Sequence, residues 1–311
     1  MTMFHKATKT QKRLRLSLYG VSGSGKTYSA LAIAKGLGGK VAVIDTERGS
    51  ASAYANLFQF DTLEMAPPFS PAAYVAAIKA AEGEGYDILI IDSLTHAWSG
   101  AGGALEMVDN AAKRSQSGNS YTAWRDVTPE HNRLIDAIIG AKCHVIATMR
   151  SKAEYVLEED SRGKKVPKKK GMAPIQRDGM EYEFDVVAEM NGDNEMVIQK
   201  TRCPELSGQV IPKPNGATSA ILRAWLTDGA PPPEPKKPDP LTPEQLAVLN
   251  AAADWLIANV KMTESTVAGL KQHVAATGFV KPESARDAQA VRDAFFRWVE
   301  TALAAPMEAA K

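Results

Sequence analysis

Residues 20–27 read GVSGSGKT, a complete phosphate-binding loop of the form GxxxxGK[ST]. Residues 14–19 before the loop alternate apolar and polar side chains, as a short strand does, and residues 28–37 after it follow a helical pattern. Because glycine lacks a Cβ, such a loop can curl and direct successive backbone N–H groups inward, beside the positive end of the following helix. The order of strand, loop and helix therefore predicts an α/β domain that binds a nucleoside triphosphate.

The residues of this loop have separate expected roles. Lys26 is expected to reach the β- and γ-phosphates of ATP, and the Thr27 hydroxyl is expected to hold Mg²⁺. The remaining loop contacts to the nucleotide are expected from Gly20, Ser22, Gly23, Ser24 and Gly25. ATP and Mg²⁺ are therefore the predicted cofactors.

Two carboxylates that follow apolar runs complete the predicted site. Asp92 closes the run 87–92, DILIID, and a strand-end aspartate in this kind of fold binds Mg²⁺ directly or through water. Ser93 follows it where many ATPases have a water-activating glutamate, so the base must come from elsewhere. Glu47, just beyond the apolar run 41–45, is the candidate for orienting or deprotonating the attacking water.

The chain divides into four expected segments. Strand-like runs alternate with helical stretches over residues 14–228, which indicates an α/β domain with a mainly parallel sheet. Residues 1–13 are polar and basic and are expected to form a flexible arm. A Pro-rich linker is expected at 229–240, followed by a small all-helical domain at 241–311. The clearest strand runs are 14–19, 41–45, 88–92, 144–149, 186–190 and 196–200.

Three helix starts are predicted where a capping hydroxyl precedes a proline. The pairs are Ser70-Pro71, Thr128-Pro129 and Thr242-Pro243.

The composition of the chain limits its possible partners. The net charge is +1, so any binding to nucleic acid must come from a local basic patch. No apolar run is long enough to cross a membrane, so no membrane partner is expected, and two isolated cysteines fit a reducing cytoplasm.

The two strand ends carry a resemblance to a known family. Asp45-Thr46-Glu47 and Asp92-Ser93 resemble the RecA/RadA-type core of P-loop NTPases. In that family the glutamate after the second strand is the catalytic base, so the resemblance implies this role for Glu47. The run 144–150, HVIATMR, resembles the family's fourth strand, which ends in a residue that senses the γ-phosphate. Thr148 occupies that place, where the family commonly has Gln or Asn.

A late strand carries a second part of the same resemblance. Residues 198–202 read IQKTR, and RecA-core oligomers supply a KxR or KxK pair from such a strand to a neighbouring subunit. The resemblance implies that Lys200 and Arg202 offset the charge on the γ-phosphate of a neighbouring copy. A homo-oligomer, either ring or filament, is therefore expected. The alternative is an ordinary solvated strand end.

A narrower resemblance covers roughly residues 14–226. Segment 171–190, GMAPIQRDGMEYEFDVVAEM, together with Trp124 and the KTR segment, resembles the RecA-like ATPases encoded by bacteriophages. Some members of that group are single-strand annealing or recombination proteins that act with a single-stranded-DNA-binding protein. The resemblance implies an oligomeric ATPase that acts on single-stranded DNA in phage recombination, located in the host cytoplasm.

Residues 154–170, EYVLEEDSRGKKVPKKK, predict a hairpin with an acidic-apolar strand, a turn and a basic strand. Six cations fall within nine residues: Arg162, Lys164, Lys165, Lys168, Lys169 and Lys170. In the RecA-type core the segment after the fourth strand is a mobile DNA-binding loop, which implies that these cations neutralise phosphates without reading sequence. The alternative is a solvated charge run in which the acids of the same segment pair with the lysines.

Two weaker signals and two rival functions stay open. The polar loop 113–121 stands where the family has its first DNA loop. Residues 4–7, FHKA, have the FxxA form that links neighbouring subunits in RadA-type filaments, here through Phe4 and Ala7. One rival is a small-molecule P-loop kinase in which Glu47 and Arg48 hold a substrate. The other is a nucleotide-gated module in which the helical tail recruits a partner.

Overall fold

The structure is a computed structural model that describes residues 4, 6–114, 120–159 and 165–231. The helical domain expected at 241–311, the helix start at Thr242-Pro243 and all but the first three residues of the 229–240 linker lie outside the described residues.

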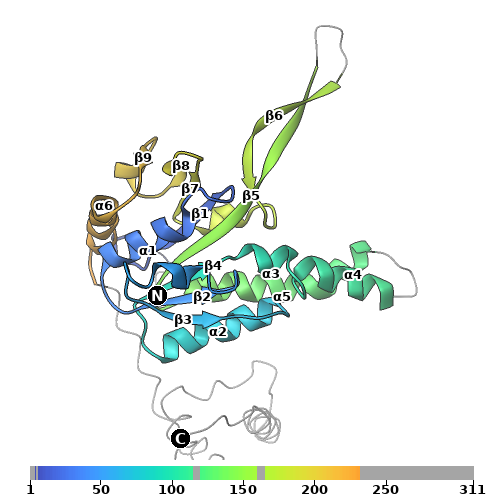
Figure 1. The fold of residues 1–311 in the computed structure, drawn as a ribbon, viewed down its shortest axis with the longest axis horizontal. Coiled ribbons are helices and arrows are strands. Elements are labelled where there is room, and N and C mark those ends of the chain that lie inside the picture. The colour runs from blue at the N-terminus through green and yellow to red at the C-terminus, as the bar shows by residue number, and fades with distance from the viewer. Residues whose placement is uncertain (1–3, 5, 115–119, 160–164, 232–311) are drawn as a thin grey trace, which may run out of the picture. The chain divides into compact units, whose positions relative to one another are not determined.

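A mixed, mainly parallel sheet forms the centre of the described domain (Figure 1). Its strands are β1 (Arg15–Gly20), β2 (Val41–Asp45), β3 (Asp61–Glu64), β4 (Ile88–Asp92), β5 (His144–Glu159), β6 (Lys165–Pro174), β7 (Val186–Met190), β8 (Glu195–Thr201) and β9 (Val210–Pro212). Within the described residues the order is β3-β2-β4-β5-β1-β7-β8-β9, and β6 pairs only with β5. The strands from β3 to β7 in this order run parallel, and β8, β9 and β6 pair antiparallel with their neighbours.

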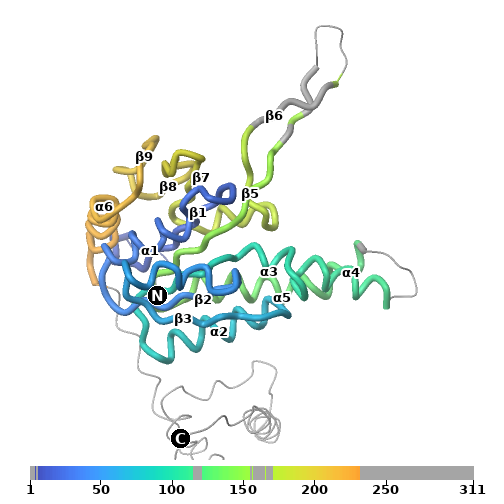
Figure 2. The backbone as a smooth tube through the Cα atoms, in the orientation of Figure 1, coloured from blue at the N-terminus to red at the C-terminus, as the bar shows by residue number. Residues whose placement is uncertain are grey.

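Helices cover both faces of this sheet (Figures 1 and 2). They are α1 (Lys26–Leu37), α2 (Pro71–Gly83), α3 (Thr95–Ser99), α4 (Ala104–Arg114), α5 (Ser120–Gly140) and α6 (Gly216–Thr227), with short 3₁₀ turns η1 (Ala51–Tyr54), η2 (Met180–Glu183) and η3 (Pro204–Leu206). Alternate residues of β4 serve the two faces, because Ile88 and Ile90 pack with α1 and α6 while Leu89 and Ile91 pack with α2 and α5. The predicted α/β class with a mainly parallel sheet is confirmed.

Five of the six predicted strand runs agree with observed strands to within a residue or two, and the sixth, 144–149, is the first part of a longer strand. The apolar run at 14–19 becomes β1, one residue later, and the run at 144–149 continues ten residues further as β5. Strands β3 and β9 were not predicted from the sequence. All four residues of β3 are exposed and β9 has only three residues, so neither has the apolar run that identifies a buried strand.

One predicted helix start is confirmed and another is wrong. Ser70 caps α2 by accepting the backbone N–H of Ala73 at 3.2 Å, and Pro71 follows it in the first turn. Thr128-Pro129 does not begin a helix, because Pro129 lies inside α5, which begins at Ser120. Pro129 is exposed on α5, so the backbone carbonyl that loses its hydrogen-bond partner can be hydrated.

The predicted basic hairpin is present. Strands β5 and β6 pair antiparallel from Ser151 opposite Pro174 to Glu159 opposite Lys165, with an irregularity between Glu154 and Tyr155. Figure 2 shows the backbone of β5 leaving the central sheet to form this arm. The same strand is therefore part of the core at its beginning and part of the hairpin at its end.

The chain before β1 is held against the end of α6. The backbone N–H of Gln11 donates to Ala230 O at 2.8 Å, and that of Lys12 donates to Leu226 O at 3.2 Å. Lys9 also forms an ion pair with Asp228. The segment expected to be a flexible arm up to residue 13 is thus fixed from Lys9 onward.

Candidate functional site

The loop between β1 and α1 has the backbone that its glycines were expected to allow. Gly25 has φ +81°, and α1 begins at the next residue, Lys26. A Cβ on Gly20 would lie 2.2 Å from Met190 O and 2.7 Å from Ser24 Oγ, so only glycine fits at the end of β1. The loop is therefore a backbone cradle at the N-terminus of a helix, the arrangement that binds phosphate.

The loop side chains divide into those that brace the loop and those that face outward. Ser24 is buried, and its Oγ donates to Val21 O at 2.8 Å. Ser22 is exposed. Lys26 Nζ donates to Gly20 O at 3.0 Å and to Val21 O at 2.7 Å, so its ammonium lies over the loop where phosphate oxygens would compete for it. Burial lowers the pKa of Lys26, and the nearby carboxylates of Asp92 and Glu47 oppose that shift.

Asp92 lies beneath the loop with a threonine on each carboxylate oxygen. Thr27 Oγ1 donates to Oδ2 at 2.6 Å, and Thr148 Oγ1 donates to Oδ1 at 2.5 Å. Burial raises the pKa of Asp92, and the two hydroxyl hydrogen bonds act against that rise. A buried carboxylate beside a hydroxyl offers the hard oxygen ligands that Mg²⁺ prefers, so the predicted metal residues Thr27 and Asp92 fit the ion.

Thr148, the residue predicted to sense the γ-phosphate, contacts Asp92. Its side chain is fully buried within β5, and its hydroxyl is donated to Asp92. In this arrangement Thr148 orients the carboxylate that faces Thr27. The expected sensing of the γ-phosphate by Thr148 stays a prediction, and the observed contact provides an indirect route through Asp92.

Glu47 is presented to the same site by a turn that Asp45 organises. The Asp45 carboxylate accepts the backbone N–H of Glu47 at 2.6 Å and that of Ala51 at 2.9 Å. Arg48 takes a left-handed conformation with φ 59°. The Glu47 side chain is 30% exposed, so water can reach its carboxylate. Glu47 acts electrostatically on both Asp92 and Lys26, as expected for a carboxylate at this site.

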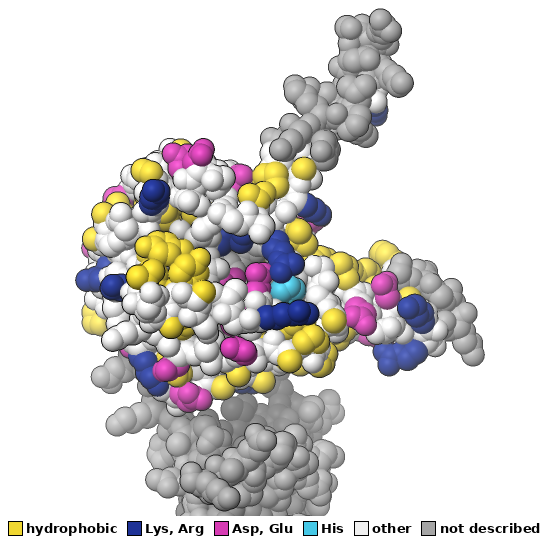
Figure 3. Space-filling model, in the orientation of Figure 1, with side chains coloured by type: hydrophobic (Ala, Val, Ile, Leu, Met, Phe, Trp, Pro, Cys, Tyr) yellow, Lys and Arg dark blue, Asp and Glu magenta, His cyan; other side chains and the backbone are white. Residues whose placement is uncertain are grey.

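Arg150 joins this site although sequence reasoning did not select it. Its Nε lies 3.1 Å and its Nη2 3.0 Å from Glu47 Oε1. Arg150 pairs with Gly20 in the β5–β1 register, so it lies level with the start of the phosphate-binding loop. The only signal in the sequence was an arginine directly after a buried apolar strand. In Figure 3, acidic, basic and histidine side chains gather on one face beside the base of the hairpin.

A small hydrogen-bond network ties the ends of β2 and β4 together behind Glu47. The Thr46 hydroxyl accepts the Ser93 N–H at 2.8 Å and lies 2.6 Å from His96 Nδ1. Burial lowers the pKa of His96, and the positive charge of Arg150 lowers it further. His96 also stacks on Phe69, with 5.0 Å between the ring centroids. This network fixes the residue before Glu47 and the residue after Asp92.

An aromatic cavity adjoins the loop, and sequence reasoning missed it. It has a volume of about 980 Å³ and is lined by Gly23 and Gly25 of the loop, by Asn194 and by three aromatic residues. The Tyr28 ring meets the rings of Tyr54 and Phe58 edge-to-face, at centroid distances of 5.6 and 5.2 Å. The signal that could have found this cavity was Tyr28, an aromatic residue directly after the loop. A cavity with aromatic walls next to a phosphate cradle suits a planar nucleotide base.

Lys200 and Arg202 lie away from the loop of their own chain. Strand β8 runs antiparallel to β7, so its C-terminal end lies beside the N-terminal ends of β1 and β7. The phosphate-binding loop follows the opposite, C-terminal end of β1. Lys200 Nζ donates to three backbone carbonyls, those of Glu181, Tyr182 and Phe184. Arg202 is half exposed and forms an ion pair with Asp185 at 3.3 Å. Neither cation can reach the phosphate-binding loop of the same molecule.

The candidate DNA-binding residues are described only in part. Lys165 is exposed, and Lys168, Lys169 and Lys170 belong to β6, although nothing is described of their side chains. Arg162 and Lys164 lie outside the described residues. In the second candidate loop, α4 ends at Arg114 and α5 begins at Ser120, while residues 115–119 lie outside the described part of the chain.

Comparison with known protein families identifies a matching domain family. A model of the AAA domain family matches residues 12–209, a span that includes the phosphate-binding loop, Glu47, Asp92, Arg150 and the KTR segment. No curated protein matches this chain. Among the helices of the described residues, none is long and apolar enough to span a membrane.

Proposed function

This chain belongs to the AAA domain family, and from that premise we propose that it is an ATPase that acts on single-stranded DNA as a homo-oligomer. The role that we propose is recombination or strand annealing in a bacteriophage, together with a single-stranded-DNA-binding protein. Its family accounts for nucleotide binding and hydrolysis in general. The DNA, the oligomer and the phage setting are our proposals.

The proposed hydrolysis depends on residues that the fold brings together at the C-terminal ends of the parallel strands. Lys26 and the loop N–H groups would hold the phosphates, and Thr27 with Asp92 would hold Mg²⁺. When bound, Mg²⁺ neutralises charge on the phosphate oxygens. Glu47 would orient the attacking water and accept its proton, and Arg150 would keep the carboxylate aligned. The aromatic cavity beside Tyr28 would take the base.

The observation that carries the DNA proposal is the continuity of β5. This strand passes Arg150, whose guanidinium contacts Glu47, and continues without a break into the hairpin with β6. The hairpin segment carries the six cations counted in the sequence, within nine residues. Cations in such a row neutralise backbone phosphates without regard to base sequence. A strand shared by the catalytic site and the basic arm supports a DNA-stimulated ATPase over a small-molecule kinase.

The oligomer proposal follows from the position of the KTR segment. Because Lys200 and Arg202 cannot reach their own phosphate-binding loop, they could act only on the nucleotide of another copy. The three N–H donors of Lys200 already meet three carbonyls, whereas the Arg202 guanidinium is half exposed. We therefore propose Arg202 as the principal trans-acting cation and Lys200 as its support.

The test is the steady-state ATPase rate of the full chain with and without single-stranded DNA, measured over a range of protein concentrations. We expect stimulation by DNA and a specific activity that rises with protein concentration as copies assemble. Lys26→Ala is the control, because it removes the phosphate contact and should abolish both rates. An ATPase rate that DNA leaves unchanged would refute the DNA proposal. Phosphorylation of a nucleoside by labelled ATP would favour the kinase instead.

A further inference from the structure

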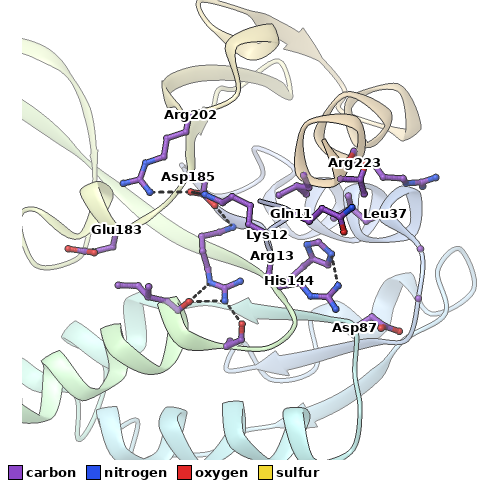
Figure 4. A pocket seen from close by; sticks show the side chains of 17 residues that line it. Gln11, Lys12, Arg13, Leu37, Asp87, His144, Glu183, Asp185, Arg202 and Arg223 are labelled. Carbon is purple, nitrogen blue, oxygen red and sulfur yellow. Dashed lines mark hydrogen bonds and ion pairs between the residues drawn. The ribbon is translucent and has the colours of Figure 1, made fainter. Parts of the chain in front are cut away.

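A second cavity, of about 770 Å³, lies at the N-terminal ends of the parallel strands, on the side of the sheet opposite the phosphate-binding loop. Its walls come from the start of β1, the start of β5, the approach to β7, the end of β8 and the end of α6 (Figure 4). Of the residues assigned above to phosphate, Mg²⁺ or water, Arg202 alone lines it, and its proposed role is toward the nucleotide of another copy. Whatever this cavity binds is therefore separate from the nucleotide held by the loop of the same molecule.

The charges that line this cavity do not balance. Five cationic residues line it, against three acids: Lys12, Arg13, Arg15, Arg202 and Arg223 against Asp87, Glu183 and Asp185. Asp185 is buried and already has three partners, because it pairs with Lys12 and Arg202 and accepts the Arg15 backbone N–H. Figure 4 shows its carboxylate between Lys12 and Arg202. With Asp185 shared between two of the cations, five cations against three acids leave the cavity lining with a net positive charge.

Arg15 and Arg223 serve the fold itself. The buried Arg15 guanidinium donates to the carbonyls of Leu14, Cys143, Ile139 and Ala141, which closes the end of α5. Arg223 donates to Gly36 O near the end of α1. Cations at helix C-termini are favoured by the helix dipole, so these two arginines need no further ligand.

The charge of Arg13 is not explained by a hydrogen bond to the end of a helix. It is exposed, and within the described residues it forms no ion pair with a carboxylate. Its side chain makes a polar contact with His144, whose Nε2 lies 3.4 Å from Arg13 Nη1. Figure 4 shows the guanidinium beside the imidazole ring, on the side of the cavity away from Asp185.

The contact between Arg13 and His144 brings two donors together. The backbone N–H of Leu14 donates to His144 Nδ1 at 2.9 Å, so Nδ1 must carry a lone pair. The neutral ring then carries its proton on Nε2, and this N–H faces the N–H of Arg13. Burial and the charges of Arg13 and Arg15 lower the pKa of His144 to about 4, so the ring is neutral near neutral pH. Two N–H donors this close together are both satisfied by one acceptor oxygen that lies beside the pair and bridges them.

We propose that this cavity binds a phosphate-type oxyanion through the Arg13 guanidinium and the Nε2–H of His144. The net positive charge of the cavity lining, five cations against three acids, adds a long-range attraction. Arginine suits this ligand because its planar fork matches two oxygens of a phosphate. The phosphate can come from a free anion or from the backbone of a nucleic acid, and the chemistry of recognition is the same.

The experiment uses the full chain with Lys26→Ala, which removes phosphate binding by the loop. Thermal unfolding is followed as inorganic pyrophosphate or a short oligothymidylate is added at constant ionic strength. We expect pyrophosphate to raise the unfolding midpoint of this variant, and addition of Arg13→Ala to weaken the affinity by about tenfold or more. Arg133→Ala removes an equal charge from an exposed ion pair on α5 and should leave the affinity unchanged.

The two ligands separate the sources of phosphate. A response to pyrophosphate alone identifies a free anion, and an Arg13-dependent response to the oligothymidylate as well identifies nucleic acid. The ¹⁵N-edited signal of the His144 Nε2–H should also shift on addition of pyrophosphate. The proposal is overturned if the Lys26→Ala variant shows no response to either ligand, or if Arg13→Ala and Arg133→Ala affect the response equally. Because Arg13 is exposed, its loss should leave the fold intact.

Discussion

Arg150 holds Glu47 through two nitrogen atoms on one carboxylate oxygen, at 3.1 Å from Nε and 3.0 Å from Nη2. These residues are 103 positions apart in the chain, and they meet because β2 ends on the same side of the sheet at which β5 leaves it for the hairpin. The backbone of Arg150 is also fixed, since its N–H donates to Thr95 Oγ1 and its carbonyl accepts the N–H of Ile175. Ile175 directly follows the hairpin, so the hairpin closes at the residue that holds the candidate base.

Replacing Glu47 with glutamine should leave ATP binding intact and stop turnover. Glutamine has nearly the same shape but cannot accept a proton, so we expect kcat to fall by about 10²- to 10⁴-fold. Equilibrium binding of labelled ATP and single-turnover hydrolysis would measure the two properties separately. Glu130→Gln, on the exposed face of α5, is the matched control and should change neither. Unchanged hydrolysis in Glu47→Gln would remove this residue from the mechanism.

Arg150→Ala should lower kcat while the affinity for ATP changes little. The carboxylate of Glu47 would lose the guanidinium that aligns it, and misplacement of a catalytic group costs on the order of tenfold to a hundredfold in rate. Arg150→Lys keeps the charge but loses the two-nitrogen contact, so its rate should lie between those of the alanine variant and the native chain. If the lysine variant were as slow as the alanine variant, geometry rather than charge would be the decisive property. Native rates in both variants would contradict the assignment.

Tyr28→Ala should raise KM for ATP with little change in kcat. Loss of one aromatic wall from the cavity beside the loop costs roughly 1–2 kcal/mol of base binding, which is about a five- to thirtyfold rise. Inorganic triphosphate has no base, so its inhibition constant should be the same for the variant and the native chain. Equal losses for ATP and triphosphate would instead indicate damage to the loop. Tyr121→Ala, on an exposed aromatic residue of α5 outside this cavity, is the control.

Neutralising the hairpin lysines Lys164, Lys165, Lys168, Lys169 and Lys170 with glutamine should weaken binding to single-stranded DNA. Each lost phosphate contact reduces the slope of log affinity against log salt by about 0.7, so five contacts would flatten it by roughly 3.5. Fluorescence anisotropy over a salt series measures the slope directly. Lys79→Gln, on the exposed side of α2, should not alter it. A slope equal to that of the native chain would exclude the hairpin from DNA binding.

The parts of this site that the sequence predicted are local, and the parts that it did not are made by pairing distant segments. The loop and Asp92 are recognised because each depends on residues that are adjacent in the chain. Arg150 and the aromatic cavity depend on the order of strands in the sheet and on the turn after β2, which no short pattern specifies. Strand β3 escaped prediction because an exposed edge strand has no apolar run. Pro129 predicted a false boundary because packing on both sides of it outweighs the lost hydrogen bond.

Stability should fall as the pH drops through the range set by His144. Burial, with the charges of Arg13 and Arg15, lowers the pKa of this ring to about 4, against an ordinary value of 6.5, and the nearby Asp87 only partly offsets these effects. The folded state therefore binds fewer protons than the unfolded state between these values. The contribution of His144 is fully present above about pH 6.5 and is lost as the pH falls towards 4. We expect a loss of roughly 1–2 kcal/mol in the free energy of unfolding between about pH 7 and 5.

His144→Asn isolates this contribution from those of other groups that titrate in the same range. The asparagine Oδ1 can accept the Leu14 N–H that His144 Nδ1 now accepts, so the start of β5 keeps its hydrogen bond to the start of β1. Urea unfolding at a series of pH values should show a shallower loss of stability in the variant, since it has no group to protonate. Parallel pH profiles for the variant and the native chain would mean that His144 titrates alike in the folded and unfolded states.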